Sequence, residues 1–356
     1  MSASSPLSNP NAGADLAALL ARYNLLVRTE IERLLPDTPR LAPFYGIMAY
    51  HLGWVDRYLQ PESARPGKSL RPALCLLLAE ALGADLADCA PLAAGIELLH
   101  NFSLIHDDIQ DRSPTRRGRP TVWSIWGEAQ AITVGDSMFS LAHQAWLRAP
   151  LAERDPGRLL DIARALEDTI KALCEGQYLD VDGEGSLTIT TDAYLMMIGG
   201  KTAALMGTSA WVGCRCAGGD PALLQAARTF GTELGLAFQI RDDLLGIWGD
   251  EITTGKSVSS DISSRKMSLP VVMALEHGSA EQRAALAARY AAAPVDAEDE
   301  AATRALLTEA GAYQRAADQE DEHWRAALRA LDALGLEPPW EERLRVFATS
   351  LVGRSA

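Results

Sequence analysis

Cysteine is scarce in this sequence, and the few cysteines present form no recognisable metal or disulfide pattern. There are five in 356 residues, and none belongs to a C-x-x-C pair. Cys214 and Cys216 are separated by a single residue, which is too close for the usual zinc-binding spacing. An odd number of cysteines in a chain of this length indicates reduced thiols, so we expect a cytoplasmic protein.

Long apolar runs are also missing. A membrane-spanning helix needs about 18 or more consecutive apolar residues. The most apolar stretch, residues 70–99, is interrupted by acidic side chains. Residues 1–15 contain no basic residue and no apolar run, so we expect a flexible tail there and not a signal peptide. The sequence therefore predicts no transmembrane segment.

Positive charge is in deficit. The chain has 33 Lys and Arg residues against 47 Asp and Glu residues, which gives a formal net charge of -14 at pH 7. This excess of negative charge argues against nucleic acid or an anionic membrane surface as the main partner. It does not exclude a small anionic substrate, because a few clustered cations and bound metal ions reverse the field locally.

The residues that are present describe a globular helical protein. Hydrophobic residues make up 48% and charged residues 22% of the chain. Apolar residues recur at spacings of three and four, and we find neither an alternating run nor an Asn-Gly hairpin signal. We therefore predict an all-α fold, a single-domain helical bundle over residues 16–356. The expected helices cover residues 17–35, 41–59, 70–82, 88–108, 122–147, 157–182, 190–216 and 221–248, with more from residue 279 onwards.

A cluster of aspartates ends the apolar helix expected over residues 88–108. In Asp107-Asp108-Ile109-Gln110-Asp111, the first and last residues are four apart and share a helix face, with Asp108 beside them. Carboxylates so close repel one another unless a cation lies among them. Oxygen ligands favour Mg²⁺, which usually takes one or two carboxylates plus substrate phosphates and water. The alternative is a solvated acidic helix end.

A second acidic pair, Asp242-Asp243, also follows an apolar helical run. Two such pairs on separate helices can face each other across a cavity and hold metal ions together with a diphosphate. The alternative is that these two aspartates are merely solvated at the surface. The apolar residues on both sides of the pair argue against that alternative.

Cationic residues accompany both acidic motifs, and a loop of cations at a helix start suits phosphate oxygens. Instead of binding phosphate, the cations could form a solvated basic loop, and the histidine, His100, could be a hydrogen-bonded core residue. Lys68 and Arg71 flank a helix start, His100 precedes Asp107 by about two turns, Arg116 and Arg117 follow the first motif, Lys201 and Thr202 follow two glycines, and Lys256 and Lys266 follow the second motif.

Together these motifs resemble the trans-isoprenyl diphosphate synthases, or polyprenyl synthetases. The resemblance spans residues 66–270, and the motifs occur in the family's order. It implies an isoprenoid-synthase helical bundle with a central cavity, typically a cytoplasmic homodimer. The matching segments are GKSLRP, ELLHNFSLIHDDIQD, RRGRPTVW, the Gly135-Asp136 pair, GQYLDV, GGKTAAL, FQIRDDLLG and the GKS…SDI…RK loop.

The resemblance also implies roles for single residues. Mg²⁺ ions bridged to the allylic diphosphate would bind to Asp107, Asp108 and Asp111, with Asp242 and Asp243 opposite. The same diphosphate would contact Arg116, Lys201 and Lys256. The diphosphate of isopentenyl diphosphate, the second substrate, would bind to Lys68, Arg71, His100 and Arg117. Thr202 and Gln239 would line the reacting centre.

One position departs from the family pattern. The family's second motif usually has a third Asp where this chain has Gly246. Asp250 lies two helical turns beyond Asp243, roughly 10 Å along the axis, which is too far to chelate the same ion. Some bacterial members resemble this chain in having Gly there, so an aspartate introduced at position 246 is expected to have a mild effect.

The activity that the resemblance implies is chain elongation by a trans-prenyltransferase. The length of the product depends on residues four and five before Asp107, which are Ser103 and Phe102. An aromatic residue five before the motif, a small residue four before it and no insertion within it resemble the geranylgeranyl diphosphate pattern. We therefore predict a twenty-carbon product, with fifteen or twenty-five carbons as alternatives.

Two other functions fit parts of this pattern. A terpene cyclase on the same fold would ionise a prenyl diphosphate but would have no use for a complete isopentenyl diphosphate site. A regulatory subunit or helical scaffold for another synthase would have no use for intact acidic motifs. Elongation is therefore the favoured function.

Overall fold

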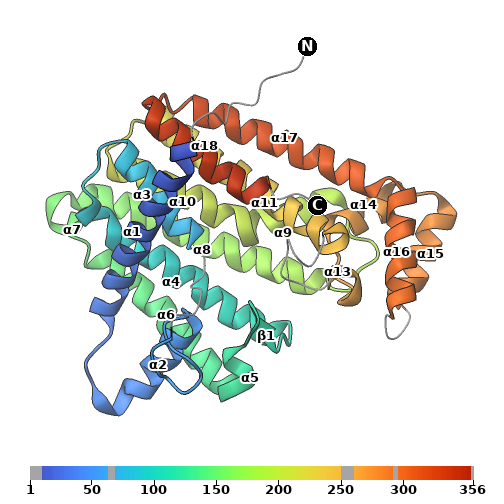
Figure 1. Cartoon of the computed structure of the whole chain (residues 1–356), viewed down its shortest axis with the longest axis horizontal. Coiled ribbons are helices and arrows are strands. Elements are labelled where there is room, and N and C mark those ends of the chain that lie inside the picture. The colour runs from blue at the N-terminus through green and yellow to red at the C-terminus, as the bar shows by residue number, and fades with distance from the viewer. Residues whose placement is uncertain (1–9, 63–68, 250–259, 292–295, 354–356) are drawn as a thin grey trace. The chain divides into compact units, whose positions relative to one another are not determined.

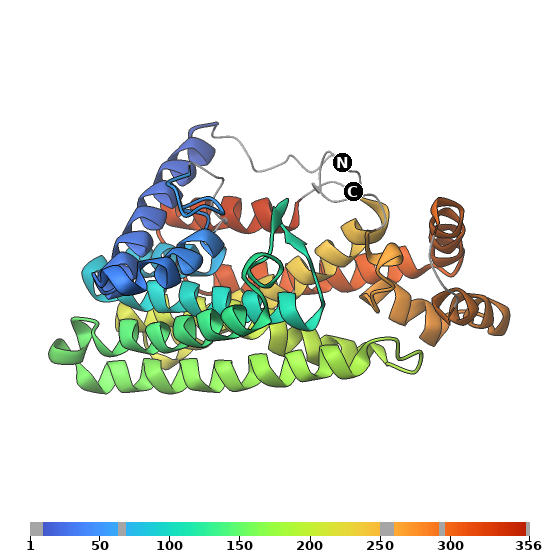
Figure 2. The same cartoon turned by 90° about the horizontal axis from the view of Figure 1, so that it is seen from below.

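The computed structural model describes residues 10–62, 69–249, 260–291 and 296–353 (Figures 1 and 2). The predicted all-α class is confirmed, because these residues form helices joined by loops and only one short two-stranded sheet. Within the described ranges, no helix is long and apolar enough to cross a membrane. The chain divides into two compact units. Unit 1 takes in residues up to 165 and residues 209–224, and unit 2 takes in residues 166–208 and those from 225 onwards.

Unit 1 is built around α4 (Leu86–Gln110), which contacts α1 (Pro10–Leu34), α3 (Leu70–Ala81) and α6 (Glu128–Leu147). Asp85 caps the start of α4, and its side chain accepts a hydrogen bond from the backbone N–H of Ala87. Most of α4 is buried, as expected for a helix that is apolar on all sides. Its C-terminal end carries the first acidic motif.

Shorter elements complete unit 1 and correct two of the expected helices. The helix expected over residues 41–59 ends at His51, and the helix expected over 122–147 is broken at Gly127, whose φ of 83° is left-handed. The expected tail is also shorter, because α1 begins with proline at Pro10, a residue that suits the first helical turn. The shorter elements of unit 1 are η1 (Pro39–Leu41), α2 (Ala42–His51), β1 (Thr115–Arg116), β2 (Arg119–Pro120), α5 (Val122–Trp126) and α7 (Leu151–Arg154).

Unit 2 has a core in which α9, α11, α14 and α17 meet. Tyr194, Ile240, Leu244, Leu269 and Ala316 belong to one buried cluster, which fixes the C-terminal half of α11. Helices α8, α10 and α11 contribute residues to both units. The elements are α8 (Pro156–Gly183), α9 (Thr191–Ile198), the π-helix η2 (Gly199–Ala203), α10 (Ala204–Cys216), α11 (Pro221–Trp248), α13 (Ser260–Ser263), α14 (Leu269–His277), α15 (Ala280–Ala291), α16 (Ala297–Glu309), α17 (Ala312–Asp332) and α18 (Pro338–Val352).

Candidate active site

In unit 1, the first acidic motif converges on one arginine. The guanidinium of Arg116 donates from Nη2 to Asp107 Oδ2 at 2.9 Å and from Nε to Asp108 Oδ1 at 2.7 Å. Asp108 is only 2% exposed, and its Oδ2 has no hydrogen-bond partner. Burial raises the pKa of Asp108 to about 6, and Arg116 opposes that rise. A buried carboxylate oxygen without a donor is suited to a cation.

The third aspartate of this motif is placed differently. Asp111 is the C-cap of α4 and is exposed to solvent. Among the described residues, no three His, Cys, Asp or Glu side chains are arranged to hold a metal ion by themselves. The oxygen donors of Asp107 and Asp108 nevertheless fit Mg²⁺, because this ion commonly takes one or two carboxylates and completes its shell with phosphate oxygens and water.

Arg116 lies on a hairpin that the sequence did not predict. Strands β1 and β2 pair Arg116 with Arg119, and the turn between them is Arg117-Gly118. Both turn residues are left-handed, with φ of 53° and 74°, as in the primed turns of two-residue hairpins. A residue other than glycine in this region costs about 1–2 kcal/mol, and such strain is typical of functional positions. Strands of two residues are too short to show an alternating pattern.

The hairpin is anchored to the C-terminal end of α2. Arg119 donates to the carbonyl oxygens of Tyr50 at 3.2 Å and Val55 at 2.8 Å, and its guanidinium lies over the Tyr50 ring. The hydroxyl of Tyr50 donates in turn to the carbonyl oxygen of Pro120 at 2.7 Å. These contacts orient the hairpin, so that Arg119 supports the fold while Arg116 reaches the first acidic motif.

Two residues predicted to hold isopentenyl diphosphate are in direct contact. Arg71 Nη1 lies 3.1 Å from His100 Nε2, which must accept because a guanidinium only donates. Burial lowers the pKa of Arg71 to about 10 and, with Arg71 alongside, holds the pKa of His100 well below its usual value. Arg71 Nε is buried without a partner. Arg71, held against a neutral His100, therefore has a donor left for an anion. Lys68 lies outside the described residues.

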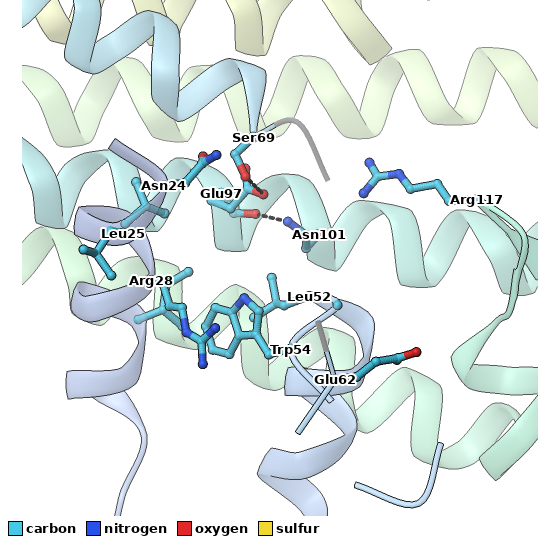
Figure 3. Close-up of a pocket in the computed structure, with 13 residues that line it drawn as sticks. Asn24, Leu25, Arg28, Leu52, Trp54, Glu62, Ser69, Glu97, Asn101 and Arg117 are labelled. Atoms are coloured by element: carbon cyan, nitrogen blue, oxygen red, sulfur yellow. Dashed lines mark hydrogen bonds between the residues drawn. The ribbon is translucent and has the colours of Figure 1, made fainter. Parts of the chain in front are cut away.

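Arg117 lines a pocket of unit 1 with a volume of about 330 Å³ (Figure 3). Figure 3 shows Arg28 entering from α1 on one side and Arg117 on the opposite side, with Glu97 and Ser69 between them. Ser69 Oγ donates to Glu97 Oε1 at 3.0 Å, while Glu97 Oε2 has no partner. Burial raises the pKa of Glu97, which is 7% exposed. The pocket thus offers hydrogen-bonding groups and enough room for a small ligand.

Sequence reasoning missed His51 in unit 1. It ends α2, its Nε2 is buried without a partner, and its imidazole interacts electrostatically with Arg116, Arg117 and His100. Nothing in the local sequence singled it out, because only the anchoring of the hairpin on α2 brings it to these cations.

In unit 2, the second acidic motif is held by donors of the protein itself. Asp243 is 1% exposed and accepts hydrogen bonds from the Tyr194 hydroxyl, from the Leu269 backbone N–H at 3.2 Å and from Gln239 Nε2 at 3.2 Å. Lys266 Nζ lies 3.5 Å from Asp243 Oδ1. Asp242, next in the chain, is partly exposed. The motif is therefore anchored through Asp243.

The predicted residues Lys201 and Thr202 lie on the π-helix η2, which interrupts the helix expected over 190–216. Such π-helical turns are frequent at functional sites. Thr202 Oγ1 donates to Gln239 Oε1 at 3.0 Å, and Lys201 forms an ion pair with Asp180 of α8. Thr202 and Gln239, which were both predicted to line the reacting centre, are thus in contact, and Gln239 links Thr202 to Asp243.

Glycines allow η2 to approach α8 closely within unit 2. A Cβ on Gly176 would lie 2.3 Å from the backbone nitrogen of Lys201, and one on Gly200 would lie 2.5 Å from the Ala172 carbonyl oxygen. Neither position tolerates a side chain without a shift of backbone. These two glycines therefore set the position of Lys201.

Three residues around this motif, Tyr194, Asp180 and Asp261, were not singled out from sequence, and Lys266 was named there only as a cation without an assigned role. Burial, with Asp243 alongside, raises the pKa of Tyr194 well above its usual value. Burial alone would lower the pKa of Lys266, but the surrounding carboxylates outweigh it and raise that pKa. There was only a weak indication in the sequence that Asp180 and Asp261 belong to the site, namely that both lie inside segments matching the family. Lys256 lies outside the described residues.

The two predicted chain-length residues lie on α4 near α6. The Phe102 ring makes edge contacts with Phe139 and His106, at centroid distances of 5.1 and 5.2 Å. Ser103 Oγ donates to the His100 carbonyl oxygen at 2.8 Å. Phe102 is therefore braced by a second aromatic ring, and its role in product length stays a prediction.

Known proteins share both the sequence and the structure of this chain. A sequence model of the family described as polyprenyl synthetase matches residues 53–308. The chain is 40% identical over 326 residues to (2E,6E)-farnesyl diphosphate synthase of Mycobacterium tuberculosis, covering 89% of this chain and 87% of that protein. It is 43% identical over 290 residues to geranylgeranyl diphosphate synthase of the same organism, covering 81% of each.

A crystal structure of a polyprenyl synthetase from Streptomyces coelicolor A3(2) superimposes with a TM-score of 0.85 at 37% identity, covering 95% of this chain and 99% of the other. The matched family segment contains every described residue of the two acidic motifs and of the basic clusters. The chain therefore belongs to the polyprenyl synthetase family.

Proposed function

We propose that this protein, a short-chain trans-prenyltransferase, is a magnesium-dependent geranylgeranyl diphosphate synthase. It would condense isopentenyl diphosphate with allylic diphosphates to form all-trans products. The observation that carries the proposal is in unit 1. There the orphaned Oδ2 of Asp108 is suited to a cation, and Arg71 has an unused donor suited to an anion. The magnesium that accompanies the allylic diphosphate would supply the cation, and isopentenyl diphosphate would supply the anion.

For the metal, we propose that Asp107, Asp108 and Asp111 and the second motif, Asp242 and Asp243, hold Mg²⁺ with the allylic diphosphate. When bound, Mg²⁺ neutralises charge that develops on the departing diphosphate. The hydrogen bonds to Asp243 support a fixed orientation of the second motif, and Arg116 does the same for Asp107 and Asp108.

The cations divide between the two substrates in this proposal. Arg116, Lys201 and Lys256 would bind the allylic diphosphate, and Lys68, Arg71, His100 and Arg117 would bind isopentenyl diphosphate. Arg116 and Lys201 are at present paired with carboxylates of the chain. These pairs keep both side chains charged and oriented until a diphosphate arrives.

The reaction needs no protein nucleophile. The allylic C–O bond breaks, the double bond of isopentenyl diphosphate attacks the resulting cation, and a proton leaves the new C–C adduct. Thr202 donates its hydroxyl hydrogen to Gln239, so its oxygen lone pairs would remain available to stabilise the cation. Enclosure in an apolar helical fold would keep water away from that cation.

Product length is the finer part of the proposal. Phe102 would limit the growing chain, and the packing of its ring against Phe139 supports a firm limit. Relatives named for fifteen-carbon and twenty-carbon products are both similar to this chain. We propose the twenty-carbon product because Ser103, and not a second aromatic ring, stands four residues before Asp107.

The proposal is tested by sizing products. The pure protein would be incubated with isopentenyl diphosphate, Mg²⁺ and, in separate reactions, dimethylallyl, geranyl or farnesyl diphosphate. We expect geranylgeranyl diphosphate as the end product from each primer. A final product of fifteen carbons would overturn the length assignment, and cyclic hydrocarbons without consumption of isopentenyl diphosphate would overturn elongation.

We also propose that the protein is a cytoplasmic homodimer with one enzyme domain over residues 16–356. The family segment at residues 53–308 takes in parts of both units, which supports one functional domain. The reduced cysteines support the location. Light scattering coupled to size-exclusion chromatography tests the dimer, and a monomeric mass for active protein would contradict it.

A further inference from the structure

A series of aromatic rings follows the contact between α4 and α6 in unit 1 (Figure 1). Phe102 of α4 meets Phe139 of α6 at a centroid distance of 5.1 Å. The Phe139 ring meets His143 at 4.6 Å, and His143 meets Trp146 at 4.9 Å. The series therefore begins at the residue proposed to limit product length and ends at a ring that has no part in the proposed chemistry.

Trp146 packs directly against a glycine of α4. A Cβ on Gly95 would lie 1.9 Å from Trp146 Nε1, 2.5 Å from its Cδ1 and 2.8 Å from its Cε2. All three atoms are closer than a Cβ tolerates, so the indole ring occupies the place of a side chain at position 95. Trp146 is only 2% exposed. The ring thus fills the space between the two helices at this level.

Gly95 lies on the same side of α4 as Phe102 and farther from the first acidic motif. The two residues are seven apart, which is close to two full turns and roughly 10 Å along the helix. Asp107 is proposed to hold the diphosphate and Phe102 to stop the chain. A product that passed Phe102 would therefore grow toward the N-terminal end of α4 and would next reach the level of Trp146.

We propose that Trp146 is a second specificity-determining residue, which closes the product space two helical turns beyond Phe102 by packing on Gly95. This proposal rests on the proposed function, because it requires a prenyl chain that grows along α4. Phe102 sets the product length of wild type, and Trp146 sets the greatest length that can form once Phe102 is removed.

The orientation of the indole suits a barrier against a hydrocarbon chain. Its Nε1 is the atom nearest to position 95, so the polar edge of the ring faces the backbone of α4. The carbon atoms of the six-membered ring are left to face the space between the helices. A buried tryptophan in ordinary core packing usually finds an acceptor for its N–H, whereas Trp146 Nε1 has none. These two observations favour a barrier over packing alone.

The product lengths of four proteins test the order of the two barriers. Phe102→Ala should give a longer product than wild type, with a sharp upper limit. Trp146→Leu alone should leave the product length of wild type unchanged, because Phe102 still stops the chain first. The double variant should exceed the upper limit of Phe102→Ala by at least one five-carbon unit. Chromatography of dephosphorylated products would measure all four lengths.

Two results would overturn the proposal. The first is a double variant with the same upper limit as Phe102→Ala, since Trp146 would then close nothing. The second is a longer product from Trp146→Leu alone, since the chain would then reach Trp146 without passing Phe102. Leu147→Ala is the matched control, because Leu147 is the next residue of α6 and is exposed, and it should leave the product of Phe102→Ala unchanged.

A second variant keeps the test decisive if Trp146→Leu folds poorly. Trp146→Phe keeps an aromatic ring but makes it smaller, so the loss of packing is slight. In the Phe102→Ala background it should move the product distribution toward longer chains. An unchanged distribution in a correctly folded protein would contradict the barrier.

The packing of Trp146 on Gly95 is testable without catalysis. Gly95→Ala should lower the melting temperature of wild type, but it should do so much less in the Trp146→Leu background, where the methyl group finds room. Additive shifts in melting temperature would overturn the spatial pairing.

Failure of this proposal and failure of the proposed function are distinguishable. A wild type that makes no prenyl diphosphate would overturn the proposed function, and the second length limit with it. An active wild type whose double variant makes no longer product than Phe102→Ala would overturn the role of Trp146 alone.

Discussion

The carboxylate of Asp108 accepts a hydrogen bond from Arg116 through Oδ1, while its Oδ2 is buried without a partner. Replacing that oxygen by an amide group tests its purpose. Asp108→Asn keeps the volume and should reduce turnover by about two to three orders of magnitude, because the amide is a poor metal ligand and adds a donor. Steady-state kinetics and circular dichroism would measure activity and fold.

Asp192→Asn is the control for this change, since Asp192 is exposed in the first turn of α9 and outside the proposed site. It should leave kcat within about twofold of wild type. Near-normal turnover in a correctly folded Asp108→Asn protein would contradict the metal assignment.

The two diphosphate sites predict different kinetic signatures. Arg117→Ala should raise the KM for isopentenyl diphosphate by about ten- to hundredfold, and Lys201→Ala should do the same for the allylic substrate. Each cation is proposed to meet one substrate, so the other KM should change little. Initial rates with each substrate varied in turn would measure both constants. Equal effects on the two constants in either variant would refute the division.

Phe102 gives a third prediction at the scale of one side chain. Its ring packs against Phe139, and removal of the ring by Phe102→Ala should open space for at least one more five-carbon unit. Ser103→Phe should shorten the product by filling space. Chromatography of dephosphorylated products would measure the lengths. Identical product lengths from wild type and both variants would remove the basis of the length assignment.

At the scale of an element, the π-helix η2 carries Lys201 and Thr202 and depends on glycine in the facing helix α8. Gly176→Ala would place a methyl group 2.3 Å from the Lys201 backbone nitrogen. We expect a loss of about 1–3 kcal/mol in the free energy of unfolding and a higher allylic KM, because η2 must shift. Chemical denaturation and initial-rate kinetics would measure the two effects.

Gly157→Ala provides the matched control on the same helix. Near the start of α8, a Cβ on Gly157 meets only Asp155 Oδ1, at 3.6 Å. That change should be neutral or slightly stabilising, since alanine favours a helix over glycine. If Gly176→Ala were equally harmless, the close approach would not position Lys201.

Elements also show where sequence reasoning succeeds and where it stops. The long helices follow from apolar periodicity, so α3, α4, α8 and α11 lie close to their predicted ranges. The hairpin was missed because its strands have two residues each and its turn is Arg-Gly. The break at η2 was missed because no local pattern reveals it, and neither does its close packing on Gly176 of another helix.

The candidate site was predictable to a similar extent. Asp107, Asp108 and Arg116 were assigned from sequence, and the structure brings them into contact. Tyr194 and His51 were not, because their partners are distant in sequence. Gly246 was recognised as a departure, but its neighbour Asp261 could not be predicted, because it lies fifteen residues later and on another helix.

For the whole molecule, His51 predicts a loss of stability in acid. Burial, with Arg116, Arg117 and Arg119 nearby, lowers the pKa of His51 to about 3, against about 6.5 in an unfolded chain. The folded state therefore disfavours a proton that the unfolded state binds. This contribution to stability is fully present above about pH 6.5 and is lost as the pH falls toward 3.

Urea denaturation between pH 7.5 and pH 4 would measure this dependence, with pH values spaced by about half a unit. His51→Phe removes the titrating group and should flatten the dependence on pH relative to wild type. If the free energy of unfolding fell equally with pH in wild type and His51→Phe, the loss of stability in acid would not come from His51.

The central claim is that a divalent metal held by aspartates drives condensation of isopentenyl diphosphate with an allylic diphosphate. The most direct measurement follows isopentenyl diphosphate into product before chelation, after excess EDTA and after added Mg²⁺. We predict that EDTA abolishes incorporation, that Mg²⁺ restores it, and that the restored product has twenty carbons. Undiminished incorporation by the fully chelated enzyme would contradict the account.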